Sequence, residues 1–489
     1  MKQVINSAAA VVPLLEGRPS ASQARLEVVP LVLILLTAFA GLYTASVGVS
    51  RVLVQGLGVG VLLALGVPLA AGVLKRPETL ARPIYVFFLG CLYFFVLDMA
   101  LLREVEEFQP GTILVAETIT IAFIVATIGT WYLVPLRRTP WSAVLKRADG
   151  TLVGNAYFWI ALTAFGLEYM RRIAFVDWSF SDLGHELLLS KTGGAFRRDV
   201  AGDWGIFLQP IEVLFLGVTV FADRAWKRGI SLLRKLILLI VVILQLGTFV
   251  LDGARGSLLM AVMLPLFVRS AQFDRAVGRW LCGFVLASFL LAPMMDVMVG
   301  VRRRGWSEIS QVEQINWNIV QAHRDDSFFW VVNLVDFLQQ GYGVLGHKGP
   351  LGFVEGVREI GWLWLIAPVP RVFWPDKPLP TEMGDETRAW YATDSIVGGL
   401  LRSGGLTFVI FGGFLFGLWL KLLDPLFQSP KSDGAAIAYA FLLTVTLAMT
   451  RSTAPWNVVP LLLTFSLTVI GWRVIRFLRR LSAPLTLEV

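Results

Sequence analysis

Residues 404–423, GGLTFVIFGGFLFGLWLKLL, contain no charged side chain before Lys421. A helix of this length rises about 30 Å, at ~1.5 Å per residue, which matches the hydrocarbon core of a bilayer. The run therefore predicts a helix that crosses a membrane. Composition extends the prediction to the whole chain, because 56% of its 489 residues are hydrophobic and only 16% are charged. Soluble domains do not sustain that balance over such a length.

Apolar runs recur along the chain and predict an all-α, polytopic integral membrane protein of about twelve transmembrane helices. The predicted spans are 27–48, 52–73, 83–101, 112–136, 153–169, 204–222, 236–251, 257–270, 280–300, 404–423, 434–450 and 458–476. They divide the chain into a tail (1–26), nine helices (27–300), one large loop (301–403), three helices (404–476) and a second tail (477–489). No cleavable signal-peptide pattern precedes the first span, which we expect to be retained.

The distribution of basic residues predicts the orientation, because Lys and Arg mark cytoplasmic loops. With the N-terminus inside, the seven cytoplasmic segments carry 24 Lys and Arg residues. The four short external turns carry one each: Arg51, Arg103, Arg255 and Arg451. Both tails are then cytoplasmic, and the loop 301–403 is extracytoplasmic. The net charge of +8 follows from this topology, so nucleic acid is not required as a partner.

Part of the large loop is apolar, yet it does not predict another span. Residues 350–370 include Glu355, Arg358 and Glu359, which are costly at the middle of a bilayer. The uncharged part, 360–370, would make only about 16 Å of helix. We expect this segment to lie in the membrane interface or to dip into the membrane and return.

Acidic residues in the predicted spans all fall in the outer half of their helix or at its outer end. They are Asp98, Glu117, Glu168, Glu212, Asp252 and Asp296. Intramembrane carboxylates usually face a cavity, so this asymmetry predicts a polar cavity that opens to the outside. The alternative is that acids at helix ends are simply solvated. A transporter needs a route on both sides, which makes an outward-facing site of chemistry the better interpretation.

Basic residues in the external segments are suited to binding phosphate. Arg255 lies in a tight turn, LDGARGSLL (251–259), beside backbone amides at a helix start. Arg371 lies in PVPRVFWPDKP (368–378), whose prolines restrict the backbone. The alternatives are arginines that reach bulk lipid headgroups, or an Arg371 that pairs with Asp376.

Cysteines and histidines do not indicate a disulfide or a metal site. Cys91 and Cys282 fall inside predicted spans, where an external disulfide does not form. The three histidines are dispersed along the chain, at 185, 323 and 347. We expect no metal and no other cofactor.

Three stretches together resemble bacterial oligosaccharide-repeat-unit polymerases, the O-antigen and exopolysaccharide polymerases often called Wzy. They are PVPRVFWPDKP, with the pattern P-R-x-x-W-P-x-K-P, the run GGLLRSGGLTFVIFGGFLFGLWL (398–420), and DGARGSLL. The resemblance covers roughly residues 250–423 and is supported by the predicted topology.

The resemblance implies a metal-independent membrane glycosyltransferase of the GT-C type. Such an enzyme moves a growing glycan from one undecaprenyl diphosphate to a new repeat unit that is carried on a second molecule of the same lipid. The reaction takes place at the outer face of the inner membrane. Partners are therefore this lipid-linked oligosaccharide, membrane lipids and a chain-length regulator protein. The reaction needs positive charge for the departing diphosphate and a base or hydrogen-bond acceptor for the attacking hydroxyl.

These needs assign roles to residues of the external segments. The candidates for diphosphate binding are Arg255, Arg371 and Arg451, followed by Arg302, Arg303 and Lys377. The candidates for the base are Asp252, Asp296, Glu382 and His323. The candidates for stacking on sugar rings are Trp306, Trp374, Trp390 and Tyr391. Core packing or membrane anchoring is an equally good interpretation of these aromatic residues.

Two other functions remain open. An O-antigen ligase or another GT-C transferase would use the same donor with a different acceptor, and His323 or His347 would suit a ligase. A flippase or other transporter of lipid-linked oligosaccharide would instead show inverted internal repeats, which the sequence does not display.

Overall fold

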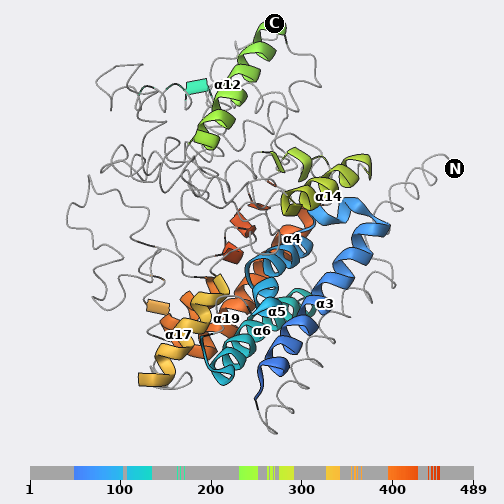
Figure 1. Ribbon diagram of the computed structural model, residues 1–489. Coiled ribbons are helices and arrows are strands. Elements are labelled where there is room, and N and C mark those ends of the chain that lie inside the picture. The colour runs from blue at the N-terminus through green and yellow to red at the C-terminus, as the bar shows by residue number, and fades with distance from the viewer. Residues whose placement is uncertain are drawn as a thin grey trace, which may run out of the picture.

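The computed structural model describes residues 49–102, 107–134, 231–251, 275–290, 327–341 and 395–427, with isolated helical residues between 162 and 170, 262 and 269, 354 and 365, and 439 and 451. Every regular element in these residues is helical, and none of them forms a strand (Figure 1). Four described helices are long and apolar enough to cross a membrane: Arg51–Lys75, Pro83–Leu101, Pro110–Leu133 and Ile396–Pro425. For the described residues, the prediction of an all-helical protein with apolar, membrane-spanning helices is confirmed. The total of twelve spans stays a prediction.

The first described span is α3 (Arg51–Lys75), and local sequence sets both of its ends. The Ser50 hydroxyl accepts a hydrogen bond from the Leu53 amide at 3.3 Å, which satisfies one of the free N–H groups at the helix start. The helix ends before Pro77, where the short 3₁₀-helix η1 (Pro77–Ala81) begins. This short helix carries the chain directly into the second span.

The second span is continuous but not uniform. It runs through α4 (Pro83–Cys91), the π-helical turn η2 (Leu92–Val96) and α5 (Leu97–Leu101). Proline is favourable at the first position of α4, because that N–H would have no helical partner. Leu102 ends α5 in the left-handed conformation, with φ of 48°. The boundaries agree with the predicted span 83–101.

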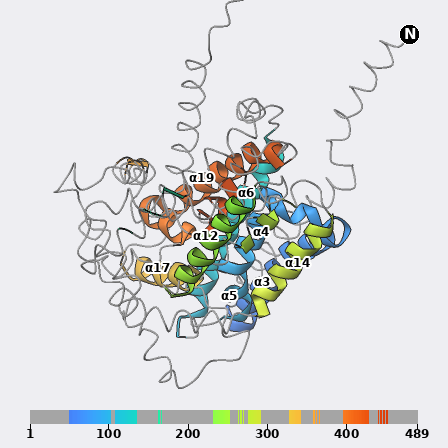
Figure 2. The ribbon, with the colours of Figure 1, turned by 90° about the horizontal axis from the view of Figure 1, so that it is seen from above.

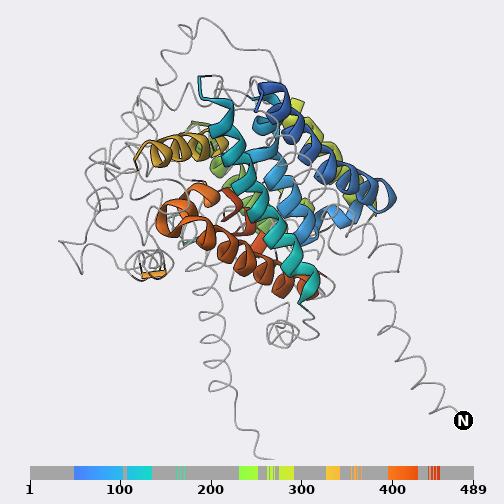
Figure 3. The same cartoon turned by 90° about the horizontal axis from the view of Figure 1, so that it is seen from below.

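Helices α6 (Pro110–Leu133) and α19 (Ile396–Phe427) lie side by side along much of their length (Figure 3). Their contact depends on Gly413 and Gly417, one helical turn apart. A Cβ added at Gly413 would lie 2.7 Å from the Phe123 carbonyl oxygen, and one at Gly417 would overlap the Thr127 carbonyl oxygen. Two backbones approach this closely in membrane proteins only where small residues face the partner helix.

These contacts also give the direction of each span. Gly413 lies against Phe123 and Gly417 against Thr127, so α6 and α19 run parallel. By contrast, Gly58 of α3 lies against Met99, and Gly72 lies against Tyr85, so α3 runs antiparallel to the second span. We name the end at which α4 begins and α6 and α19 finish the Arg82 end. The end at which α6 begins is the Pro110 end.

The parallel arrangement limits the topology of the intervening chain. The parallel direction of α6 and α19 agrees with the five spans predicted between residues 137 and 403, because an odd number of crossings brings the chain back to the side where α6 begins. The number five stays a prediction.

Helix α19 is broken near the Pro110 end, at a pair of glycines. Gly405 has φ of 73°, a conformation that favours glycine, and Gly404 is also non-helical. Residues before the break fold back alongside those after it, because the Leu400 side chain lies where a Cβ on Gly412 would stand. The break therefore coincides with the predicted boundary between the large loop and the span 404–423.

Helix α17 (Ser327–Gly341) belongs to the segment predicted as the external loop, and it packs into the same core. Its residues Phe328, Val331 and Val335 are fully buried. The Thr112 hydroxyl at the start of α6 lies 2.9 Å from Oε1 of Gln339. Helix α17 therefore packs on one side of the bundle, against α6 and α19, toward the Pro110 end (Figure 1).

Two further helices complete the description. Helix α14 (Arg275–Leu290) lies at the end of α3 where η1 follows, and the view from above shows it over that part of the bundle (Figures 1 and 2). A Cβ on its Gly278 would lie 2.6 Å from the Glu78 amide nitrogen, so α14 packs directly on η1. Helix α12 (Leu232–Leu251) is apolar and includes the predicted span 236–251.

We expect Gly417→Ala to destabilise the fold by about 1–3 kcal/mol, because the added methyl group forces α6 and α19 apart. Gly129→Ala on α6 is the matched control, because a Cβ there meets nothing within 4 Å. Thermal unfolding of the purified variants in detergent measures the difference. A Gly417→Ala protein as stable as the Gly129→Ala control would contradict the close contact between α6 and α19.

Candidate functional site

Glu117 is the most unusual polar residue of the described bundle. Its side chain is fully buried in α6, and neither carboxyl oxygen has a hydrogen-bond partner among the described residues. It lies seven residues from Pro110, or about 10 Å along the helix axis. A buried carboxyl group without a partner is unfavourable by several kcal/mol unless it holds a proton, a cation or a hydrogen-bond donor.

The surroundings of Glu117 on its own helix are apolar. Ile113, Ile121 and Ile124 lie four before, four after and seven after Glu117, so they share its face. All three are buried. The Thr120 hydroxyl on the same helix donates to the Ala116 carbonyl at 2.9 Å, whereas the Glu117 carboxyl makes no such bond to the described residues. Glu117 is therefore a candidate functional residue.

Asp98 is the second acidic residue of the predicted outer halves that the structure describes. It is buried in α5, three residues from the end of the span. Both Asp98 and Glu117 thus lie nearer the Pro110 end than the Arg82 end. The other four predicted intramembrane acids, Glu168, Glu212, Asp252 and Asp296, lie outside the described residues.

Arg402 stands in the last turn before the break of α19, next to Gly404 and Gly405. Its Nε and Nη1 atoms are buried inside the protein. A partly buried arginine beside a helix break combines a permanent positive charge with backbone amides freed from helical bonding. This combination is suited to binding an anionic group.

The sequence interpretation did not include Arg402 among the site residues. The prediction treated residue 403 as the end of a loop, which placed Arg402 just outside the span. The repeated glycines of GGLLRSGG were the signal that could have found it, because glycine pairs flanking an arginine indicate a non-helical turn.

Arg451 is the one predicted site residue that the structure describes. Thr450 lies against Gly90, because a Cβ on Gly90 would stand 2.9 Å from its Cγ2 atom. Gly90 is seven residues, or about 10 Å, from the start of a span roughly 28 Å long. Arg451, with an exposed side chain, therefore lies along the length of the bundle rather than at its end.

The remaining predicted site residues lie outside the described residues. They are the base candidates Asp252, Asp296, Glu382 and His323, the phosphate-binding candidates Arg255, Arg371, Arg302, Arg303 and Lys377, and the glycan-binding candidates Trp306, Trp374, Trp390 and Tyr391.

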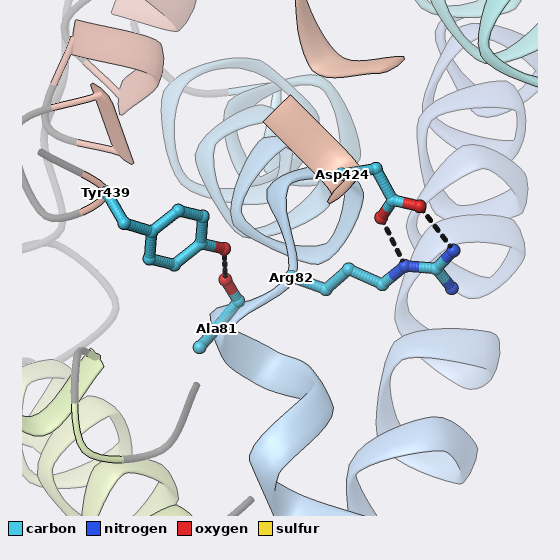
Figure 4. A network of polar contacts seen from close by, with 4 residues as sticks. All are labelled: Ala81, Arg82, Asp424 and Tyr439. Atoms are coloured by element: carbon cyan, nitrogen blue, oxygen red, sulfur yellow. Dashed lines mark hydrogen bonds and ion pairs between the residues drawn. The ribbon is translucent and has the colours of Figure 1, made fainter. Parts of the chain in front are cut away.

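The Arg82 end holds a different polar network, drawn in Figure 4. Nε and Nη2 of Arg82 donate to the two carboxylate oxygens of Asp424 at 2.6 Å and 3.0 Å. The Arg82 guanidinium also lies 4.8 Å from the ring centre of Trp131, and the Lys421 ammonium lies 4.6 Å from the same ring. The Tyr439 hydroxyl donates to the Ala81 carbonyl. The Arg82 end thus holds a charged pair whose members satisfy each other, whereas Glu117, nearer the Pro110 end, has no hydrogen-bond partner among the described residues.

Comparison with known proteins adds nothing to this geometry, because no family, no curated protein and no solved structure matches the chain.

Glu117→Leu tests whether Glu117 is retained for function. The change removes an unpartnered polar group from an apolar setting, so we expect the fold to become more stable by about 1–3 kcal/mol. We also expect the protein to lose its biological activity, which is the usual result when a destabilising residue is functional. Thermal unfolding and complementation of a deletion strain measure the two effects.

The matched control is Thr120→Val on the same helix, which removes a satisfied hydroxyl and should leave stability within about 1 kcal/mol of the parent. A Glu117→Leu protein with full activity would remove Glu117 from the functional site.

Proposed function

We propose that this protein is a membrane glycosyltransferase that polymerises oligosaccharide repeat units carried on undecaprenyl diphosphate. In this proposal it has about twelve transmembrane helices in a GT-C-like arrangement, with both termini in the cytoplasm. The Arg82 end is the cytoplasmic end, and the Pro110 end faces the periplasm. The observation that carries the proposal is Arg402 beside the broken helix, within the stretch 398–420 that resembles repeat-unit polymerases.

The chemistry of the reaction fits an arginine in this position. The bond between the glycan and the diphosphate breaks, and the lipid diphosphate leaves with additional negative charge. A partly buried guanidinium stabilises that charge more strongly than one in water, because the local dielectric constant is lower. Arg402 would bind the diphosphate together with Arg371 from the large loop, and Arg451 would add a positive charge along the bundle.

The position of Glu117 is also consistent with this reaction. A carboxyl group near the Pro110 end can hold or accept a proton when the acceptor hydroxyl attacks, directly or through an intervening group. Asp252, Asp296, Glu382 and His323 remain the other proposals for the base.

One observation favours a second candidate function. Transporters of anionic substrates also use discontinuous helices, whose broken ends face the substrate near the middle of the membrane. A flippase for lipid-linked oligosaccharide is therefore the alternative, and an O-antigen ligase is the alternative within the same enzyme class.

Reconstitution of the purified protein with lipid-linked repeat units distinguishes these functions. A polymerase converts the repeat units into a ladder of longer lipid-linked glycans. A ligase produces no ladder and transfers glycan only when lipid-A core is added. A flippase changes the leaflet of the substrate without making any new bond. Absence of a ladder from an active, folded preparation would overturn the proposed polymerase.

Arg402→Ala should reduce polymer formation by about 10²-fold or more, because one charge-assisted contact to the leaving group is lost. We expect Arg402→Lys to be nearly as inactive, since the charge remains but the bidentate geometry does not. Arg371→Ala should behave similarly. Arg279→Ala, at an exposed position of α14, is the control and should retain normal polymer formation. Normal polymer from a stably expressed Arg402→Ala protein would exclude Arg402 from the reaction.

A further inference from the structure

The Arg82 end of the bundle is held by contacts from four separate parts of the chain. Arg82 lies between η1 and α4, Trp131 is at the end of α6, Asp424 and Lys421 are at the end of α19, and Tyr439 follows later in the sequence. Arg82 connects the first three directly, through its ion pair and its contact with the indole ring (Figure 4). These groups therefore restrain one another's positions.

An apolar cluster also packs at this end of the bundle, next to the polar contacts. Leu423, Phe427 and Tyr439 pack with Leu80 of η1 and Leu281 of α14. The Phe427 and Tyr439 rings are 6.3 Å apart, and Gly278 brings α14 against the backbone of η1. The closure thus includes packed side chains as well as charges, and its opening would expose both to solvent.

The two charged groups that join α4 to α19 at this end satisfy each other. Both carboxylate oxygens of Asp424 accept hydrogen bonds from one planar guanidinium, and the two side chains are 11% and 14% exposed. A bidentate pair of this kind is strong and geometrically specific. To separate α19 from α4 would leave two largely buried charges without their partner, which is strongly unfavourable.

We propose that the contacts among Arg82, Trp131, Lys421, Asp424 and Tyr439 form a permanent latch that keeps the Arg82 end of the bundle closed. The protein then works without an inward-open state. The latch deepens the proposed function, because an enzyme needs one open side whereas a transporter must open both. The activity measurement described below rests on the proposed function. It assigns Arg82 a positioning role rather than a catalytic one.

A covalent replacement of the latch tests this directly. Arg82→Cys and Asp424→Cys are combined after Cys91 and Cys282 are changed to Ala, and the pair is joined with a short bis-methanethiosulfonate reagent. We expect the unjoined double variant to unfold several degrees lower than the parent and the joined form to recover that loss. Polymer formation by the joined form should equal that of the parent. Loss of activity on joining, reversed by reduction of the link, would overturn the latch.

A measurement independent of activity separates failure of the latch from failure of the proposed function. Leu133 of α6 and Arg279 of α14 are both exposed and lie at the Arg82 end, so each can carry a spin label. Pulsed electron resonance in nanodiscs, with and without undecaprenyl diphosphate, should give one unchanged distance distribution. Arg82→Ala should broaden it, as the positive control. A second, longer distance in the protein with its latch intact would overturn the proposal, whatever reaction the protein catalyses.

Discussion

The direct contact of the α6 and α19 backbones is the constraint on which the described structure depends. Lipid tails are as apolar as leucine, so two helices in a membrane gain little by hiding apolar side chains from each other. Their association must come from close packing, and Gly413 and Gly417 allow the α19 backbone to reach the carbonyl groups of α6. The register set by this contact places Asp424 beside Arg82 at one end and the broken segment with Arg402 at the other.

The spans could be predicted from the sequence because their length is set by the bilayer and their composition by the absence of water. The predicted ranges 52–73, 83–101 and 112–136 correspond closely to Arg51–Lys75, Pro83–Leu101 and Pro110–Leu133. Prolines at the starts of α4 and α6 make these boundaries local properties of the chain. Where a helix boundary depends on nearby residues alone, the sequence is sufficient to predict it.

The polar contacts could not be predicted in the same way. Arg82 and Asp424 are 342 positions apart, and nothing in either neighbourhood indicates the other. Glu117 was recognised as an intramembrane acid, but its full burial without a described partner depends on how α6 is covered. The burial of helix α17 could not be predicted either. It is a short apolar helix inside a long polar segment, and its burial depends on contacts with α6 and α19.

The shared direction of α6 and α19 also constrains how the chain could have changed during evolution. The gain or loss of a single hydrophobic segment between them would reverse one helix relative to the other. The glycine face of α19 would then meet α6 in an antiparallel sense, and Asp424 would lie at the opposite end from Arg82. Segments in this part of the chain can therefore be inserted or deleted only in pairs.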